Sequence, residues 1–510
     1  MLKKTANLFA SAYLLIIFCV YPLYMPKGYT NIAEDKYRFF LYVSAAAFII
    51  MGVCGILYLI TGFVEKGPEK KAYLIDWDKV SLTDMMVLLY ATAIFLSYVF
   101  TDYREEALWG ADGWYIGCAF LLLLCGLYFL ISRMWDGNEK IFYIMTAAAA
   151  LAFLLGICNR FSFYPIPLSL TAPEFISTLG NINWYCGYLS VTAPFGIGMF
   201  VLGDQRKGLL GIYTAITFMA AFSQGADSVF LWFAALLLAL LWICLKKEEW
   251  LKNWVFLVFL WSASSQLVWL MRYLFPGKYN YDADNFCGYC TDSSLMLWIM
   301  AGAAILYIII SRKKLNFSEK NVTVIKRVLL CAVFITVAGW LILSLINTKW
   351  GLPLLKDKSL FIFNKDWGNG RGAAFHAGIN IFRELPFLHK LFGAGPDCFS
   401  AYAYSIPEVS VMLHEHFGSS RLTNAHNELL TGLVNTGILG AGFYLGIFVS
   451  FIFKCIKRGE KDSEFYIFAL CAVCYLIHNV VSFAQILNLP FMFIIMGMGS
   501  KKLRGCVDKS

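Results

Sequence analysis

Charged residues are scarce in this chain. Only 15% of its 510 residues are Asp, Glu, Lys or Arg, whereas 59% are apolar. A soluble enzyme of this length carries more charge, because its surface faces water. The sequence also has no low-complexity linker, no convincing internal repeat and only one polar loop large enough to form a small domain. These absences exclude a soluble globular protein and favour a membrane protein.

Apolar runs of about 20 residues recur along the whole chain, and each is long enough to cross a hydrocarbon core of roughly 30 Å. The fourteen runs are residues 6–25, 38–63, 82–100, 114–132, 141–158, 183–203, 209–223, 226–245, 254–275, 294–311, 328–347, 428–453, 465–483 and 486–500. Because lipid offers no partner for backbone N–H and C=O groups, each run must pair its own backbone as a helix. Since the runs at 209–223 and 486–500 are short, the sequence predicts an all-α polytopic membrane protein with twelve to fourteen spans.

The distribution of lysine and arginine predicts the orientation. With a cytoplasmic N-terminus, 27 of the 42 basic residues fall in cytoplasmic segments, 7 in short outer loops and 8 in one long outer loop. This excess is the positive-inside pattern, and fourteen spans also place the C-terminus in the cytoplasm. The net charge of +9 therefore reflects topology and the anionic inner leaflet, and it does not imply a nucleic-acid partner.

Histidine is rare, and its distribution along the sequence indicates which segment holds the functional residues. The protein has six histidines, and five of them lie in the long outer loop, residues 348–427. We therefore predict three parts. Residues 1–347 hold the first eleven spans, 348–427 form an extracytoplasmic loop with the functional residues, and 428–510 hold the last spans and a cytoplasmic tail.

The sequence RLTNAHNELLTGLVNTGILGAGFYL, residues 421–445, places a polar cluster directly before an apolar helix. With Asn424 as N-cap, His426 would occupy the second helical position, and Arg421 and Asn427 would lie beside it. The positive end of the helix dipole favours a bound anion such as phosphate. It also disfavours imidazolium, which keeps a histidine neutral and able to accept a proton. The alternative is an interfacial histidine that only caps the helix or forms hydrogen bonds.

Arg371 lies in the glycine-rich segment DWGNGRG. The glycines allow the backbone to approach another surface closely, and an arginine can bind a phosphate through two parallel hydrogen bonds. The alternative is an ion pair with the nearby Asp366.

Further polar residues are expected at the outer face. Asn181 and Asn183, at the entry of the sixth span, are candidates for binding sugar hydroxyls, although helix capping would also explain them. Arg104 and Arg160 are candidates for an anion site. Outer aromatic residues could stack on sugars, but Trp and Tyr at this depth are usually membrane anchors; they are Trp109, Trp114 and Tyr115.

The outer face has little that would hold a metal. The pair in NFCGYC, Cys287 and Cys290, could form a disulfide or half of a metal site. No second pair at ligand spacing accompanies it, so we predict neither a metal nor another cofactor.

Four motifs in this order resemble those of the O-antigen ligase and polymerase superfamily of bacterial membrane glycosyltransferases. They are STLGNINW (177–184), NGRGAAFHAGINIFRELP (369–386), LFGAGPDCF (391–399) and NAHNELLTGLVNTGILGAGFYL (424–445). The resemblance implies a fold of the C-type glycosyltransferase kind. It also implies transfer of a glycan from an undecaprenyl-pyrophosphate carrier to a glycan, lipid or protein acceptor at the outer membrane face, without a metal. By this resemblance His426 matches the family's essential loop histidine and Arg371 its essential loop arginine.

The sequence departs from the family at one place. Many members carry an arginine in a short outer turn where this chain reads FSQGADS, with Asp227. Another cation would have to replace it, and the candidates are Arg104, Arg160 and Arg421. The resemblance leaves ligase and polymerase open. The alternative from another class is a transporter or flippase of lipid-linked glycans, which would favour ionisable residues near the middle of the membrane.

Overall fold

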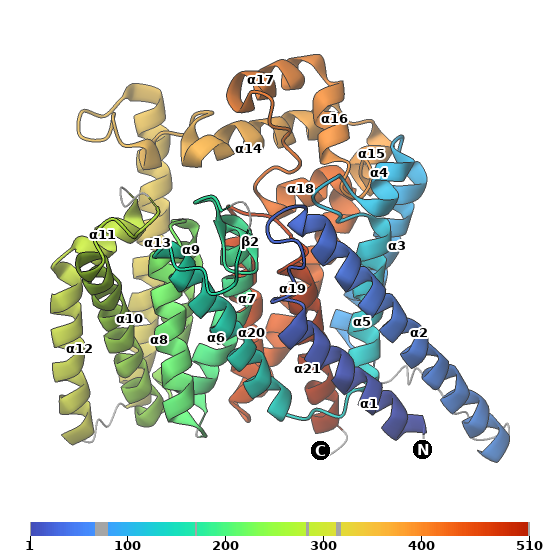
Figure 1. The fold of residues 1–510 in the computed structure, drawn as a ribbon, viewed down its shortest axis with the longest axis horizontal. Helices are drawn as coiled ribbons and strands as arrows, with labels where there is room; N and C mark the ends of the chain where they lie inside the picture. Colours follow the sequence, from blue (N-terminus) through green and yellow to red (C-terminus); the bar gives the residue numbers. More distant parts are fainter. Residues whose placement is uncertain are drawn as a thin grey trace.

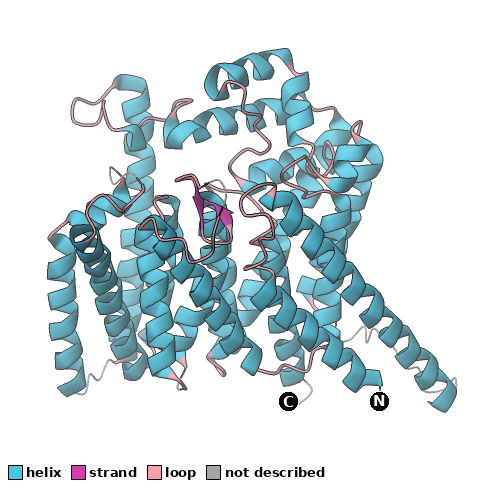
Figure 2. Ribbon diagram, viewed as in Figure 1, coloured by secondary structure: helices cyan, strands magenta, loops and turns pink. Residues whose placement is uncertain are grey.

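Helices make up nearly all of the regular structure (Figures 1 and 2). The computed structural model describes residues 2–66, 80–168, 171–203, 205–281, 285–312 and 318–507. Within these residues the only sheet is an antiparallel hairpin of β1 (Phe175–Ile176) and β2 (Gly180–Asn181), with Phe175 opposite Asn181. The prediction of an all-α polytopic membrane protein is confirmed.

Each of the fourteen apolar runs contains a helix. The helices in chain order are α1 (Leu2–Leu15) with the π-helical turn η1 (Ile16–Val20), α2 (Ile32–Lys66), α3 (Leu82–Phe100), α5 (Cys118–Met134), α6 (Lys140–Arg160), α7 (Ile182–Leu202), α8 (Lys207–Ser223), α9 (Ser228–Cys244), α10 (Glu248–Leu274), α12 (Leu295–Arg312), α13 (Glu319–Trp350), α18 (Glu428–Asn435) with α19 (Gly437–Gly459), α20 (Glu464–His478) and α21 (Leu489–Val507). Eight helices of the described residues are long and apolar enough to cross a membrane, by length and composition alone. Twelve to fourteen spans stay a prediction.

The long outer loop folds into a helical layer with a small core of its own. Its helices are η3 (Ser359–Phe361), α14 (Trp367–Glu384), α15 (Phe387–Phe392), α16 (Phe399–Ser405) and α17 (Pro407–Phe417). Buried apolar residues from these helices, such as Ala377, Ile381, Phe399 and Leu413, pack together and against Val434 of α18. In Figure 1 this layer lies across one end of the bundle, and both chain ends lie at the other end. The three-part division stays a prediction, and residues 508–510 of the predicted tail lie outside the described residues.

Two short helices connect elements at the outer end. Helix α4 (Arg104–Trp109) follows α3, and α11 (Phe286–Asp292) precedes α12. The outer layer is attached to the connection between α3 and α4 through Tyr402, whose hydroxyl donates to Asp102 (2.6 Å) and lies 3.0 Å from Nδ1 of His389. Nε2 of His389 in turn lies 2.9 Å from the carbonyl of Phe100. The loop that carries the histidines is therefore fixed on the bundle.

The helix after His426 differs from the prediction in two ways. The expected continuous span 428–453 is broken, because α18 ends at Asn435 and α19 begins at Gly437, whose φ is +69°. A side chain at Gly437 would also collide with the backbone carbonyl of Leu391, so the break brings the α15 segment against α19. The N-cap is Asn427 rather than Asn424, because the Asn427 side chain accepts a hydrogen bond from the N–H of Leu430 (2.8 Å).

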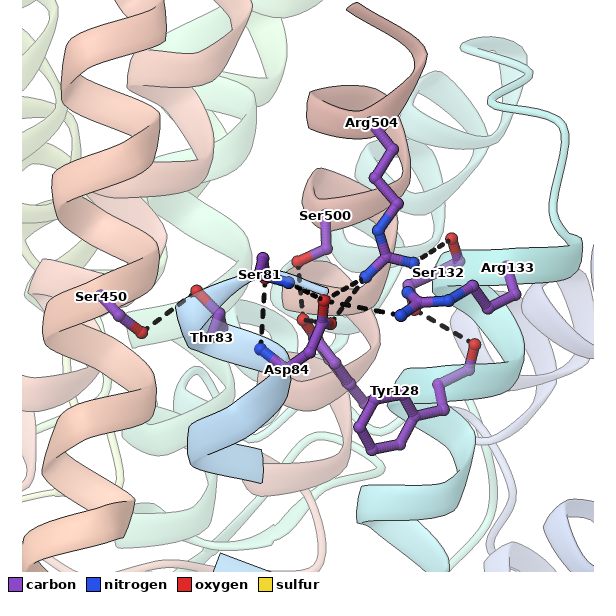
Figure 3. Close-up of polar contacts among 10 residues, drawn as sticks. Ser81, Thr83, Asp84, Tyr128, Ser132, Arg133, Ser450, Ser500 and Arg504 are labelled. Atoms are coloured by element: carbon purple, nitrogen blue, oxygen red, sulfur yellow. Dashed lines mark hydrogen bonds and ion pairs between the residues drawn. The ribbon is translucent and has the colours of Figure 1, made fainter. Parts of the chain in front are cut away.

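A buried ion cluster fastens the end of the bundle that carries the C-terminus (Figure 3). Asp84 of α3 is fully buried, and both of its carboxylate oxygens lie 2.6 Å from Nη2 of Arg504 on α21. The hydroxyl of Tyr128 on α5 donates to Asp84 (2.8 Å), and Arg133 lies 3.5 Å away. A buried carboxylate is tolerated when cations and hydrogen bonds satisfy it, so this cluster ties three helices together.

The outer layer should be accessible from outside the cell. A cysteine at the exposed Ser419 should react with an impermeant maleimide in intact cells or spheroplasts, above the background of the native cysteines. A cysteine at Glu460, exposed after α19, is the matched control and should react only after lysis. The reverse labelling pattern would contradict the orientation.

Candidate active site

Three consecutive backbone carbonyls bring Arg371 and the start of α18 to the same place. The segment Asn479–Val481 follows α20 and leads toward α21. The Asn479 carbonyl accepts from the N–H of Glu428 (3.0 Å), and the Val480 carbonyl from Nδ2 of Asn427 (2.9 Å). The Val481 carbonyl accepts from Nε of Arg371 (2.8 Å). The Asn479–Val481 segment therefore connects two parts of the outer face that are far apart in the sequence.

The local backbone around Arg371 orients its guanidinium group. Gly368, Asn369 and Gly370 all have positive φ (61°, 60° and 85°), which kinks α14 just before the arginine. This turn points the Gly368 carbonyl at Nη1 of Arg371 (2.6 Å). The predicted alternative, a pair with Asp366, is not formed, since Asp366 lies 3.0 Å from Nε2 of His416 instead. Arg371 is thus fixed by two neutral carbonyls and forms no ion pair with a residue that the structure describes, although the charge of Asp227 acts on it.

His426 lies just before α18, not at its second position as predicted. Its backbone is left-handed, with φ of +49°, and its N–H donates to Oδ1 of Asn424 (3.0 Å). The imidazole packs edge-on against Phe483, with ring centroids 5.1 Å apart. Its Nδ1 is buried and has no partner among the described residues. The ring is therefore held in place, and the hydrogen-bonding capacity of its buried Nδ1 is unused within the described residues.

The charge state of His426 follows from its surroundings. Burial, and to a smaller extent the positive charge of Arg371, together lower its pKa from 6.5 to about 4. The imidazole is therefore neutral at neutral pH, as the sequence predicted, but burial rather than the helix dipole is the main cause. Two of the first backbone amides of α18 already have acceptors. The N–H of Glu428 donates to the Asn479 carbonyl, and the N–H of Leu430 donates to Oδ1 of Asn427. These amides are not free to bind the phosphate that the sequence analysis assigned to them.

Glu428 and His478 were given no role by the sequence analysis, yet both lie at this site. The Glu428 carboxylate accepts from the hydroxyls of Tyr444 and Tyr475 and from Nδ2 of Asn479. Burial raises its pKa to about 7, and these hydrogen bonds oppose the shift. His478 is fully buried, and neither ring nitrogen has a partner among the described residues. A signal for Glu428 was its place as an acid directly before an apolar run.

An open cleft of about 850 Å³ lies beside the helix that begins at Arg104. It brings together Arg104 and Arg421, two of the predicted binding residues, and the three aromatic residues Trp109, Trp114 and Tyr115. Trp114 packs edge-on against Phe483 (4.9 Å between centroids), the residue that also contacts His426. His426 is not part of the cleft lining, but a chain of ring contacts from Trp114 to Phe483 to His426 connects the lining to the histidine.

Other predicted residues have structural contacts. Asn181 caps α7 by accepting from the N–H of Asn183 (2.8 Å), while the Asn183 carbonyl accepts from Gln485. Arg160 is 1% exposed and donates to the carbonyls of Gln224 and Pro173. The side-chain amide of Asn427 forms hydrogen bonds within the protein through both its nitrogen and its oxygen. Contact of these four residues with a substrate stays a prediction, and the structural alternative accounts for what they do here.

The outer thiols and Asp227 lie together. Cys287 and Cys290 are both buried free thiols, so the disulfide that the sequence left open is not formed. Asp227 is exposed at the start of α9, and its Oδ1 accepts from the N–H of Cys287 (3.3 Å). Because Arg160 is buried under the same turn through Gln224, it does not replace the missing family arginine as an exposed cation.

Residues 286–445 match the family model described as O-antigen ligase. This stretch is therefore similar to O-antigen ligase domains. It includes the whole outer layer, Arg371 and His426, and the match confirms the resemblance to the O-antigen ligase superfamily. No curated protein matches the chain. The apolar helices indicate a multi-pass membrane protein, and the matched stretch is similar to a family of glycosyl-transfer enzymes. The Asn479–Val481 segment and the α4 side of the cleft lie outside the matched stretch.

Proposed function

We propose that the protein transfers a glycan from an undecaprenyl-pyrophosphate carrier to an acceptor hydroxyl at the outer membrane face. One observation carries the proposal. The Asn479–Val481 segment holds a cation, Arg371, beside the start of α18, next to a neutral histidine, His426. Glycosyl transfer to a hydroxyl needs a group that accepts a proton and a group that stabilises the leaving pyrophosphate.

The roles follow from the chemistry of the bond exchange. The acceptor oxygen forms a bond to the anomeric carbon while the bond from that carbon to the pyrophosphate oxygen breaks. The hydroxyl proton passes to His426, which is neutral and has an unpartnered ring nitrogen. The negative charge that develops on the pyrophosphate is stabilised by Arg371, whose guanidinium keeps its full charge. Neither role requires a metal or a cofactor.

The transfer should survive chelation. Purified protein in EDTA, supplied with carrier-linked glycan and acceptor, should form the elongated or ligated product and release undecaprenyl pyrophosphate. The physical reason is that Arg371 supplies the charge a divalent ion would otherwise provide. Loss of turnover that added divalent ions restore would contradict this and would direct attention to Cys287 and Cys290. Movement of intact lipid-linked glycan without cleavage would support the transporter alternative instead.

Ligase and polymerase differ in the acceptor, and the glycan profile of a deletion strain separates them. Loss of long chains with single repeats retained would indicate a polymerase. Intact polymer that accumulates on its carrier would indicate a ligase.

A further inference from the structure

The cleft beside α4 has a lining that does not suit a pyrophosphate. Its two arginines, Arg104 and Arg421, face three carboxylates of the same lining, Glu105, Glu106 and Asp112. Burial raises the pKa of Glu106, and the charge of Arg421 opposes that shift, which indicates that the two residues interact. A dianion would meet more negative than positive side chains here. The interpretation of Arg104 and Arg421 as a phosphate site is therefore not favoured.

The same lining suits a sugar chain. The Trp109 side chain is 50% exposed, and Trp114 and Tyr115 lie in the same cleft, so apolar ring faces border an open space. Tryptophan and tyrosine offer a flat apolar surface together with a polar edge, which matches the C–H faces and hydroxyls of a saccharide. The volume of about 850 Å³ lies in the usual range of ligand sites, roughly 300–1,000 Å³.

A buried hydroxyl at the cleft lacks a partner. Ser400 is 1% exposed and lines the cleft, yet its Oγ has no hydrogen-bond partner among the described residues. An unpaired buried hydroxyl is costly, and a ligand hydroxyl or amide in the cleft would satisfy it. Ser400 belongs to α16 of the outer layer, whereas Trp109 belongs to α4, so the cleft is built from both sides.

The wall of the cleft is held rigidly. Asp397, in the turn before α16, is 8% exposed and accepts from the N–H groups of Ala111 (2.8 Å) and Ile116 (3.0 Å) through Oδ2. These two amides flank Trp114 and Tyr115. The aromatic wall is thus attached to the ligase domain, and Trp114 extends it to Phe483 and the His426 ring.

We propose that this cleft binds the saccharide of the acceptor and directs its terminal hydroxyl toward His426, to which the ring contacts of Trp114 and Phe483 connect the cleft. The assignment of the bound saccharide as acceptor rests on the proposed function. In this proposal the sugar rings stack on Trp109 and Trp114, and the polar groups of the sugar form hydrogen bonds with Ser400 and Arg421. The pyrophosphate of the donor binds at Arg371 instead.

The test measures binding without the donor. Oligosaccharides released by mild acid from the source organism's own surface polysaccharide are titrated calorimetrically into the full-length protein in nanodiscs. Trp109→Ala should weaken this binding about tenfold or more, because a stacked aromatic contact is lost. Trp350→Ala is the matched control, since Trp350 is 67% exposed at the end of α13 and outside the cleft. In transfer assays the Trp109 variant should raise the KM for acceptor and leave the KM for donor unchanged.

Each outcome is decisive. Unchanged oligosaccharide affinity in both Trp109→Ala and Arg421→Ala would overturn the assignment, and so would competition by inorganic pyrophosphate for the same site. Saccharide binding that Trp109→Ala weakens, in a protein that fails to transfer glycan, would support the saccharide site and overturn the transfer reaction instead. Normal transfer by the Trp109 variant at limiting acceptor would overturn the cleft and leave the proposed function standing.

Discussion

Arg371→Ala and Arg371→Lys should both reduce glycan transfer by about 10²-fold or more, because each removes a preorganised donor aimed at the leaving group. The protein should still accumulate in the membrane at its normal level. Lysine keeps the charge, but it is a point charge on a flexible chain and cannot reproduce a planar fork. The measurement is the transfer rate with purified protein at saturating acceptor, together with the amount of inserted protein.

The structure explains why the fork matters at this position. Nε is committed to the Val481 carbonyl and Nη1 to the Gly368 carbonyl. These two bonds fix the plane of the guanidinium, so its remaining N–H groups have a defined direction. An ammonium group that satisfied both carbonyls would be drawn toward them and away from a phosphate.

Arg383 provides the matched control for these variants. It lies in the last turn of the same helix, α14, and is exposed. Arg383→Lys and Arg383→Ala should therefore transfer glycan at nearly the normal rate. Near-normal activity of Arg371→Lys would show that charge alone suffices at position 371. Equal losses at positions 371 and 383 would point to a general effect on the outer layer.

Much of the fold was predictable because the membrane restricts the choices. A run of about 20 apolar residues has to be helical in lipid, and every predicted run contains a helix. The outer layer was predictable from the length and polarity of residues 348–427. Boundaries were harder. Asn424 and Asn427 are equally good helix caps by residue type, and the structure selects Asn427, whose side chain accepts from the N–H of Leu430 and donates to the Val480 carbonyl.

The parts of the site that could not be predicted are made by groups with no sequence signal. The Asn479–Val481 segment acts through backbone carbonyls, which every residue has, and it lies more than fifty residues from His426. Arg160 looks like an outer cation in the sequence, but its burial depends on contacts with Gln224 and Pro173, which other segments of the chain supply. Asp397 contacts a loop 286 residues away. Such contacts follow from tertiary packing rather than from local pattern.

His426→Ala should lower the transfer rate by about 10²–10⁴-fold, the usual contribution of a general base, with normal insertion and an intact outer layer. His426→Lys and His426→Arg should not restore activity. Both would add a cation that can bind phosphate, but neither can accept the hydroxyl proton at neutral pH. His414→Ala is the control, since His414 is exposed on α17 and Nδ1 contacts only Ser410 of its own helix. Turnover by His426→Arg, or more than about a tenth of the normal rate in His426→Ala, would contradict the role.

The pH dependence tests the same role in the unaltered protein. Burial and the charge of Arg371 lower the pKa of His426 to about 4, so the free protein holds a proton-accepting imidazole from about pH 5 upward. The acid side of the kcat/KM profile, which reports the free protein, should therefore begin to fall only near pH 4–5. Donor pyrophosphate would offset the charge of Arg371 and raise this pKa, so the acid limb of kcat should lie at higher pH than that of kcat/KM.

A kcat/KM limb near pH 7 would instead match Glu428, whose pKa burial raises to about 7. If Glu428→Gln removed such a limb, the proton acceptor would be Glu428 and not His426.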